Sequence, residues 1–239
     1  MRDNLHRALK RFYTEAGSRP AEGGGFALVL DGRAMLTPAR RPFVVASQAL
    51  AEALAAEWQA QGETIERQRM PLTRLVLTAI DRVAENPAAL GDDLANFVRT
   101  DLVCFRGVEP TELVRRQAAG WDPLIDWAAE RFGARLAVSA GIAAIDQAED
   151  AVAMLGRHIE TLPLLQLTAL HAAAQATGSL VIALAFAEGR IDAAEGLALS
   201  QIDEAFQGEC WGHDAEAVAR RQSLGRELKA CATVFALGA

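Results

Sequence analysis

The fold is decided at residues 64–83, TIERQRMPLTRLVLTAIDRV, where the pattern changes from short strands to long helices. Pro71 suits the first turn of a helix, because its missing N–H would have no partner there. Apolar residues then recur at three- and four-residue spacing, which predicts a helix with one continuous apolar face. These positions are Leu72, Leu75, Val76, Ala79, Ile80 and Val83. We therefore place a domain boundary between residues 69 and 70.

Before this boundary, the sequence has the pattern of a small antiparallel sheet. Residues 26–30 are apolar and suit a strand, and Asp31-Gly32 tolerates the positive φ of a tight hairpin turn. Residues 33–37, which include Arg33, would return antiparallel to that strand. Further strands are predicted at residues 11–15, 42–46 and 64–68, with a glycine-rich loop at 17–25.

One helix is predicted to cover a face of this sheet. It spans residues 48–61, with Ser47 as the residue that caps its free N–H groups and Gly62 as its C-terminal stop. Its apolar stripe consists of Leu50, Ala51, Leu54, Ala55 and Trp58. Trp58 is therefore expected in the core.

After the boundary, nearly every segment has helical period. Helices are predicted at residues 71–85, 88–105, 112–120, 122–133, 147–161, 163–176, 179–187, 193–207 and 214–235, with an extended segment at 135–139. Residues 179–187 are apolar all round, which is typical of a helix buried in the middle of a bundle. Asp192 and Glu195 have the spacing of a capping box.

The sequence thus predicts an α+β protein. A small N-terminal α/β domain, residues 1–69, has an antiparallel sheet and a covering helix. A larger all-helical C-terminal domain, residues 70–239, follows it.

Composition excludes several classes of protein. The formal net charge of −7 disfavours nonspecific binding to nucleic acid, and small basic clusters such as Arg220-Arg221 are expected to be solvated. The longest apolar run, residues 180–187, is far shorter than the roughly 20 residues that span a bilayer, so no stable membrane insertion is expected. The three cysteines are far apart and suit a reducing compartment.

The N-terminus has no apolar stretch typical of a secretory signal. Its basic residues are accompanied by Asp3, which argues against an organelle-targeting helix. We expect a bacterial cytoplasmic protein, or one of the mitochondrial matrix if the source is a eukaryote.

Motifs for catalysis or cofactor binding are not found. Gly23-Gly24-Gly25 lacks the lysine and hydroxyl residue of a phosphate loop, and Ser179 has a glycine on one side only, so it is expected to be a helix cap and not a nucleophile. The histidines lack metal-ligand spacing, and only Cys210 lies near one, three residues before His213. We expect no catalytic residue, cofactor or metal.

Two segments combine aromatic and acidic residues. Residues 204–216 place several carboxylates around Trp211, and residues 121–127 place two tryptophans beside acidic groups. One interpretation is that each tryptophan fills core space. The other is that such a segment forms an anchor for a partner protein.

A series of segments in order resembles the F1-ATPase assembly chaperones that attend the alpha subunit of ATP synthase. The segments that carry the resemblance are residues 11–13, 30–33, 37–38, 56–58, 61–62, 70–75, 78–81, 100–102, 117, 121–124, 177–180, 203–204, 206–207, 211–212, 214 and 216. Together they cover nearly the whole chain.

The resemblance implies a chaperone that holds the unassembled alpha subunit until the beta subunit pairs with it, with no cofactor. It also implies an N-terminal α/β domain and a C-terminal helical domain. The candidate partner-binding residues are Glu204, Gln207, Trp211, Asp214 and Glu216, joined by Asp31, Arg33 and Trp58. Asp31 has the alternative role of a turn residue, and Trp58 that of a core residue.

Two other functions remain open from the sequence. One is an enzyme of unrecognised type that uses the acidic cluster Asp203, Glu204, Glu209, Asp214 and Glu216, which would have to converge in a cleft. The other is a general holdase without a preferred client.

Overall fold

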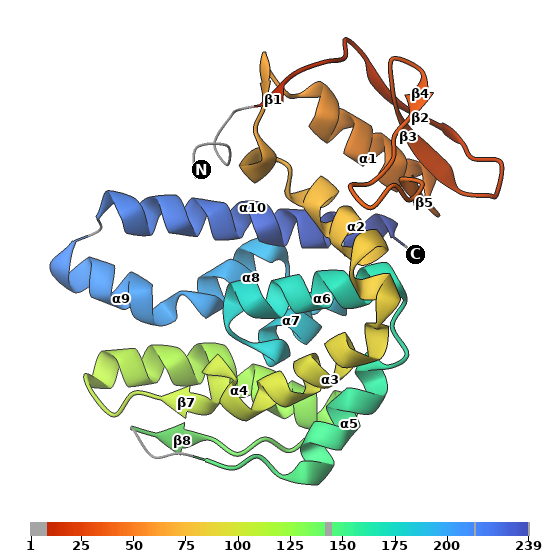
Figure 1. Ribbon diagram of the computed structural model, residues 1–239. Coiled ribbons are helices and arrows are strands. Elements are labelled where there is room, and N and C mark those ends of the chain that lie inside the picture. The colour runs from red at the N-terminus through yellow and green to blue at the C-terminus, as the bar shows by residue number, and fades with distance from the viewer. Residues whose placement is uncertain (1–8, 142–144, 213, 239) are drawn as a thin grey trace, which may run out of the picture.

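The computed structural model describes residues 9–141, 145–212 and 214–238. A small α/β part and a larger, mostly helical part lie on opposite sides of α2 (Pro71–Asp81) and α10 (Ala215–Leu237), as Figure 1 shows. The α+β class predicted from the sequence is confirmed. Residues 1–8, to which the expected absence of a targeting helix refers, lie outside the described residues.

The sheet is built around β3 (Phe26–Leu30), whose residues 27–30 are buried. It pairs antiparallel with β2 (Ala16–Pro20), β4 (Arg33–Ala34) and β5 (Val44–Val45). Asp31 and Gly32 have φ values of 46° and 74°, so the predicted hairpin turn is confirmed.

Two predictions about the first strands are wrong. Residues 11–15 form no strand, and β2 occupies part of the predicted glycine loop. The reason is that Thr14 and Glu15 donate their N–H groups to the Asp31 carboxylate at 3.0 and 2.9 Å, in place of a neighbouring strand. A separate short ladder joins β1 (Leu9–Lys10) to β6 (Thr64–Ile65).

The covering helix α1 (Gln48–Gln59) follows the prediction closely. Leu50 donates its N–H to Ser47 Oγ at 3.3 Å, and the five predicted stripe residues are the buried residues of the helix. It ends at Gln59 with Ala60 as its C-cap, two residues before the predicted end. The Tyr13 hydroxyl donates to the Trp58 carbonyl at 2.7 Å and ties the loop before β2 to this helix.

The sheet part is attached to the helical part at the start of α2. The Glu57 carboxylate of α1 accepts the N–H groups of Leu72 and Thr73 at 2.9 and 2.7 Å, so it caps the next helix. Thr37 donates its hydroxyl to Asp81 at 2.5 Å near the other end of α2. The buried apolar residues form one cluster that runs through both parts. A domain boundary at residue 70 stays a prediction.

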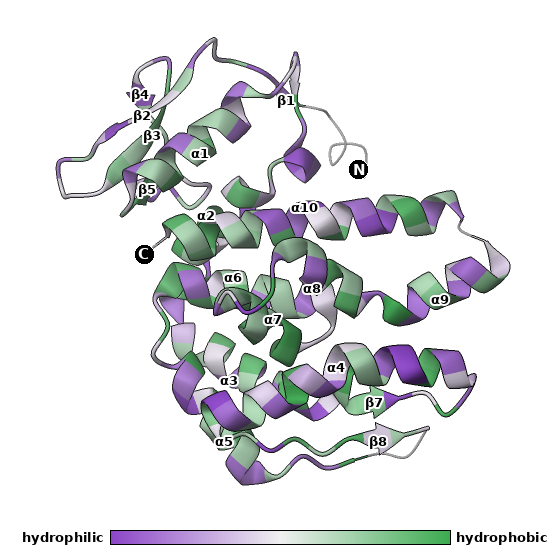
Figure 2. Ribbon diagram, turned by 180° about the vertical axis from the view of Figure 1, so that it is seen from behind, coloured by the Kyte–Doolittle hydropathy of each residue, from purple (hydrophilic) through white to green (hydrophobic). Residues whose placement is uncertain are grey.

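The rest of the chain is mostly helical. Its helices besides α2 and α10 are α3 (Pro87–Phe97), α4 (Thr111–Phe132), α5 (Glu149–Ile159), α6 (Leu164–Thr177), α7 (Leu180–Ala187), α8 (Ala193–Ser200) and α9 (Ile202–Trp211). Short 3-10 turns lie at Arg67–Arg69, Val83–Glu85, Val98–Thr100 and Leu102–Cys104. The predicted central helix is confirmed, because Leu180 to Phe186 are all buried. Figure 2 shows α7 as a largely green segment among its neighbours.

The C-terminal part is not all-helical as predicted. The helix predicted to reach residue 105 ends at Phe97, and β7 (Phe105–Arg106) pairs parallel with β8 (Ser139–Ala140). Asp101 leaves the helical conformation at φ −63° and ψ 128°, and its carboxylate accepts the Val103 N–H at 3.1 Å. This local bond competes with continuation of the helix.

Two further helix boundaries differ from the prediction. The predicted helices at 112–120 and 122–133 are one helix, α4, with Pro123 inside it. Packing of the fully buried Trp121 and of Leu124 and Ala128 on one face outweighs the hydrogen bond that proline removes. Conversely, the predicted helix at 193–207 breaks at Gln201, where φ is −119° and ψ is 24°. Among the described residues, none of the helices is long and apolar enough to cross a membrane.

Candidate functional site

The most exposed part of the helical region is an arm that we call the α9–α10 hairpin, the described residues of 202–222. No residue of α9 is buried, and the described residues from 209 to 222 are all exposed. Figure 1 shows α9 and the start of α10 projecting to one side of the bundle. The second half of α10 is different, because Leu228, Ala230, Cys231 and Val234 are buried in the core.

Five of the predicted binding residues lie on this hairpin and are exposed: Glu204, Gln207, Trp211, Asp214 and Glu216. Trp211, at the end of α9, has 80% of its surface exposed. Asp214 accepts the Ala217 N–H at 2.6 Å and thereby caps α10.

A groove of about 900 Å³ opens between α8, α9 and the first part of α10. Glu204, Asp214 and Glu216 line it, whereas Gln207 and Trp211 do not. Basic residues of α10 also line it, and Arg220 and Arg221 among them are exposed, as predicted for a solvated cluster. Only the fold shows that they share a groove with the acidic residues.

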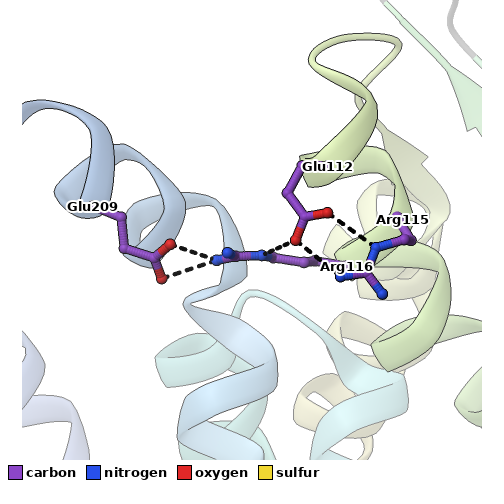
Figure 3. Close-up of polar contacts among 4 residues, drawn as sticks. All are labelled: Glu112, Arg115, Arg116 and Glu209. Atoms are coloured by element: carbon purple, nitrogen blue, oxygen red, sulfur yellow. Dashed lines mark hydrogen bonds and ion pairs between the residues drawn. The ribbon is translucent and has the colours of Figure 1, made fainter.

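Helix α4 contacts α9 through a network of charged side chains. Arg116 contacts Glu112 on its own helix and Glu209 on α9, each at 2.9 Å, while Arg115 contacts Glu112 alone (Figure 3). Hydrogen bonds from the two arginines lower the pKa of Glu112 to about 2. The network therefore stays charged over the whole physiological pH range. Deeper along α4, Gln117 donates to Asp203 at 2.7 Å.

The same helices approach very closely one turn further along α4. A Cβ atom at Gly120 would lie 2.9 Å from side-chain atoms of Ile202 and Leu199. The Trp121 indole N–H donates to the Leu199 carbonyl at 2.9 Å. Trp121 is fully buried, so the core interpretation of this tryptophan is confirmed.

The remaining predicted residues lie elsewhere. Asp31 and Arg33 are exposed at the β3–β4 turn, at the far end of the molecule from α9 (Figure 1). Hydrogen bonds from Glu15 and Thr14 lower the pKa of Asp31, which fits its role in holding the turn. Trp58 is in the core at 7% exposure, so it belongs to no surface patch. The fold does not bring these three residues to the hairpin.

Of the acidic cluster in the enzyme hypothesis, Glu204, Asp214 and Glu216 line one groove, and the other two carboxylates do not. Asp203 is bound by Gln117, Glu209 by Arg116, and Asp214 caps α10. Within the part of the chain that the structure describes, no three His, Cys, Asp or Glu side chains are placed to hold a metal ion. Burial raises the pKa of the thiols of Cys104 and Cys231 to about 12, which makes both unreactive.

One chemically unusual group was missed by the sequence analysis. Asp101 is fully buried, and burial raises its pKa to about 6. Its carboxylate accepts the Val181 N–H at 3.0 Å beside Ser179, which caps the same helix, α7, at Ile182. This Asp joins two segments that carried the family resemblance, residues 100–102 and 177–180. Its contacts identify a structural role.

Other segments of the resemblance are joined in the same way. Glu57 binds the start of α2, Thr37 binds Asp81, and Gln117 binds Asp203. These polar contacts connect elements that are distant in sequence. Many residues of the segments that carry the resemblance therefore stabilise the packing of helices and strands. The exposed hairpin is left as the candidate binding site.

Comparison with known proteins identifies related chains. A family model described as ATP12 chaperone protein matches residues 10–129. A crystal structure of Atp12 from Paracoccus denitrificans is 40% identical, with a TM-score of 0.88, covering 97% of this chain and 99% of that one. A second structure, a point mutant of the same protein, gives the same identity and TM-score. Atu1473 from Agrobacterium tumefaciens is 39% identical with a TM-score of 0.91, covering 95% of this chain and 85% of that one.

The family match spans half of the chain, and the structural matches extend over nearly all of it. The chain therefore belongs to the ATP12 chaperone family and is a chaperone of ATP synthase assembly.

Proposed function

We propose that this chain binds the unassembled alpha subunit of the ATP synthase F1 sector and prevents its aggregation until the beta subunit pairs with it. An unassembled subunit exposes an interface that is partly apolar, and such surfaces aggregate unless they are covered. A covering protein needs contact area and no catalytic group. The protein is not an enzyme in this proposal, and it needs no cofactor.

The observation that carries the proposal is the exposure of Trp211 at the tip of the α9–α10 hairpin. A tryptophan side chain buries 150–250 Å² when it is covered, and aromatic residues dominate binding energy at protein interfaces. At 80% exposure, Trp211 contributes little to the fold. The exposed position of this large aromatic side chain is explained if a partner protein covers it on binding.

The binding surface in this proposal consists of Glu204, Gln207, Trp211, Asp214 and Glu216. Asp31 and Arg33 would form at most a second, separate contact at the sheet. Trp58 is not included, because it is buried. The protein would act in the bacterial cytoplasm, or in the mitochondrial matrix if the source is a eukaryote, without nucleic acid and without insertion into a membrane.

The test is co-purification with three separate clients, followed by size exclusion: alpha subunit, beta subunit and an unrelated aggregating protein. Selective capture of alpha is expected. Equal capture of all three would indicate a general holdase, and capture of none would reopen the enzyme hypothesis. Glu204→Lys is expected to weaken capture of alpha without loss of folding. If capture is unchanged, Glu204 is not part of the site.

A further inference from the structure

The groove beside the hairpin has a basic wall. Four residues of α10 form it, Arg220, Arg221, Arg226 and Lys229, and all four are exposed. They form no ion pair with any described residue, whereas Glu227 of the same helix pairs with Arg74 at 3.0 Å. Glu204, Asp214 and Glu216 line the same groove but form no ion pair with these four residues, so the four cations can each pair with a carboxylate of a partner.

Four of the α10 residues that line the groove follow the period of a helix. Ala217, Arg221, Gly225 and Lys229 are spaced by four, so they lie along one stripe of α10. At 1.5 Å per residue, this stripe is roughly 18 Å long, about three helical turns. A helix of about twelve residues would lie along it.

The apolar lining of the groove, which we call its floor, consists of Leu197, Val218 and several small residues. Ala193 and Ala194 come from α8, Ala205 from α9, and Ala217 and Gly225 from α10. Small residues let another helix approach closely, and they leave room for bulky apolar side chains of the occupant. Glu204 on α9 also lines the groove, as do Asp214 and Glu216 at the start of α10. The groove thus has an apolar floor, four basic residues along α10, and acidic residues on α9 and at the start of α10.

We propose that this groove binds an amphipathic helix of the client, with acidic residues on the edge that faces α10 and a basic residue on the edge that faces Glu204. Charge complementarity with the basic residues of α10 and with Glu204 sets the orientation, and bulky apolar side chains fill the floor. The inference rests on the proposed binding of the alpha subunit, and it specifies which kind of segment of that subunit is held.

The first experiment reverses charge on the basic wall and measures the Kd for the alpha subunit by titration at two salt concentrations. Arg220→Glu with Arg221→Glu is expected to raise the Kd at least about tenfold and to reduce its salt dependence. The control is Arg135→Glu with Arg157→Glu, the same charge change on exposed residues outside the groove. It is expected to leave the Kd unchanged.

The second experiment fills the groove without a change of charge. Ala217→Phe is expected to raise the Kd by about the same factor, because its ring would occupy the space of the client helix. Ala219→Phe is the matched control, since it is exposed on the same helix but does not line the groove. Circular dichroism verifies that each variant is folded.

The outcomes separate the two proposals. If the wild-type chain binds alpha and the groove variants bind it equally well, the groove inference is overturned and the proposed function stands. If the wild-type chain does not bind alpha, the proposed function fails and the groove inference fails with it. Loss of binding in both groove variants but in neither control supports the inference.

Discussion

Arg116 of α4 lies 2.9 Å from the carboxylate of Glu209 on α9, although 93 residues separate them in the chain. The guanidinium also lies 5.4 Å from the centre of the Phe206 ring. Because α9 has no fully buried residue, contacts of this kind add to the packing of the partly buried Ile202 in holding α9 against the bundle (Figure 3).

Arg116→Ala is expected to loosen α9 with little loss of global stability. Exposed ion pairs contribute about 1 kcal/mol or less, so the free energy of unfolding should change by no more than that. Amide hydrogen exchange in residues 202–211 should become faster. Arg115→Ala is the control, because Arg115 contacts only Glu112 on its own helix. Equal exchange in the two variants would contradict the assigned role.

Gly120→Ala is expected to be less favourable than Gly156→Ala by about 1 kcal/mol in urea unfolding, because the added methyl group would displace the ends of the Ile202 and Leu199 side chains. Gly156→Ala, inside α5, is the matched control. Its Cβ would lie 3.5 Å from that of Ala95, an ordinary contact. This change should be neutral or stabilise by up to about 1 kcal/mol, since alanine is the better helix former. Equal effects of the two changes would rule out close packing at Gly120.

Asp101 should make stability depend on pH in a direction opposite to that of most carboxylates. Its pKa is raised from 3.8 to about 6 by burial, so the folded state binds the proton more tightly than the unfolded state. The resulting stabilisation is complete below about pH 4 and is lost as pH rises through 6. The loss is about 3 kcal/mol at most.

The measurement for Asp101 is urea unfolding of the wild type and of Asp101→Asn between pH 4 and 7. Asparagine does not titrate, so the difference isolates the carboxyl group. The stability of the wild type relative to this variant should fall as the pH rises. A constant difference across this range would show that the carboxyl group has the same proton affinity in both states.

Cys210 should be the only thiol that reacts rapidly with a maleimide in the native protein at pH 8. It is exposed, whereas Cys104 and Cys231 are buried. With a pKa of about 12, only about one in ten thousand of the buried thiols is ionised at that pH. Mass spectrometry should find one label before denaturation and three after it. Rapid labelling of Cys210→Ser would show that the core opens.

Trp211→Ala should weaken client binding without affecting the fold. At 80% exposure, its removal is expected to change the free energy of unfolding by no more than about 0.5 kcal/mol. An aromatic anchor of an interface contributes about 2 kcal/mol or more, which corresponds to a roughly thirtyfold rise in Kd for the alpha subunit. Phe12→Ala, an exposed aromatic residue near β1, is the control and should leave the Kd unchanged. An unchanged Kd for Trp211→Ala would remove it from the site.

Structural features that are determined by residues close together in the chain could be predicted from the sequence. The buried stripe of α1, the Ser47 cap and the Asp31-Gly32 turn follow from spacing and side-chain chemistry within a few residues. The capping box of Asp192 and Glu195 was found for the same reason and is confirmed. Such features are decided locally, so one sequence is enough to find them.

The features that were missed depend on distant partners. Asp101 ends a helical pattern and caps α7, 80 residues away in the chain. Pro123 continues a helix only because Trp121 beside it is anchored in the core and on Leu199. The candidate site likewise has one part that local sequence predicts and one part that depends on distant contacts. The residues around Trp211 were found as a compact acidic and aromatic segment, whereas the basic wall of the groove becomes visible only when α8, α9 and α10 are packed.

Helix α10 is continuous from the exposed site to the core, 23 residues or roughly 35 Å. Its first half carries Arg220, Arg221 and Arg226 of the basic wall, and the buried residues lie in its second half. The helix packs against α6, α2 and α8. A stiff arm of this kind is already ordered before the client arrives, so little conformational entropy is lost on contact. Because the same helix carries the groove and the buried residues Leu228 and Val234, the core packing fixes the direction in which its exposed half points.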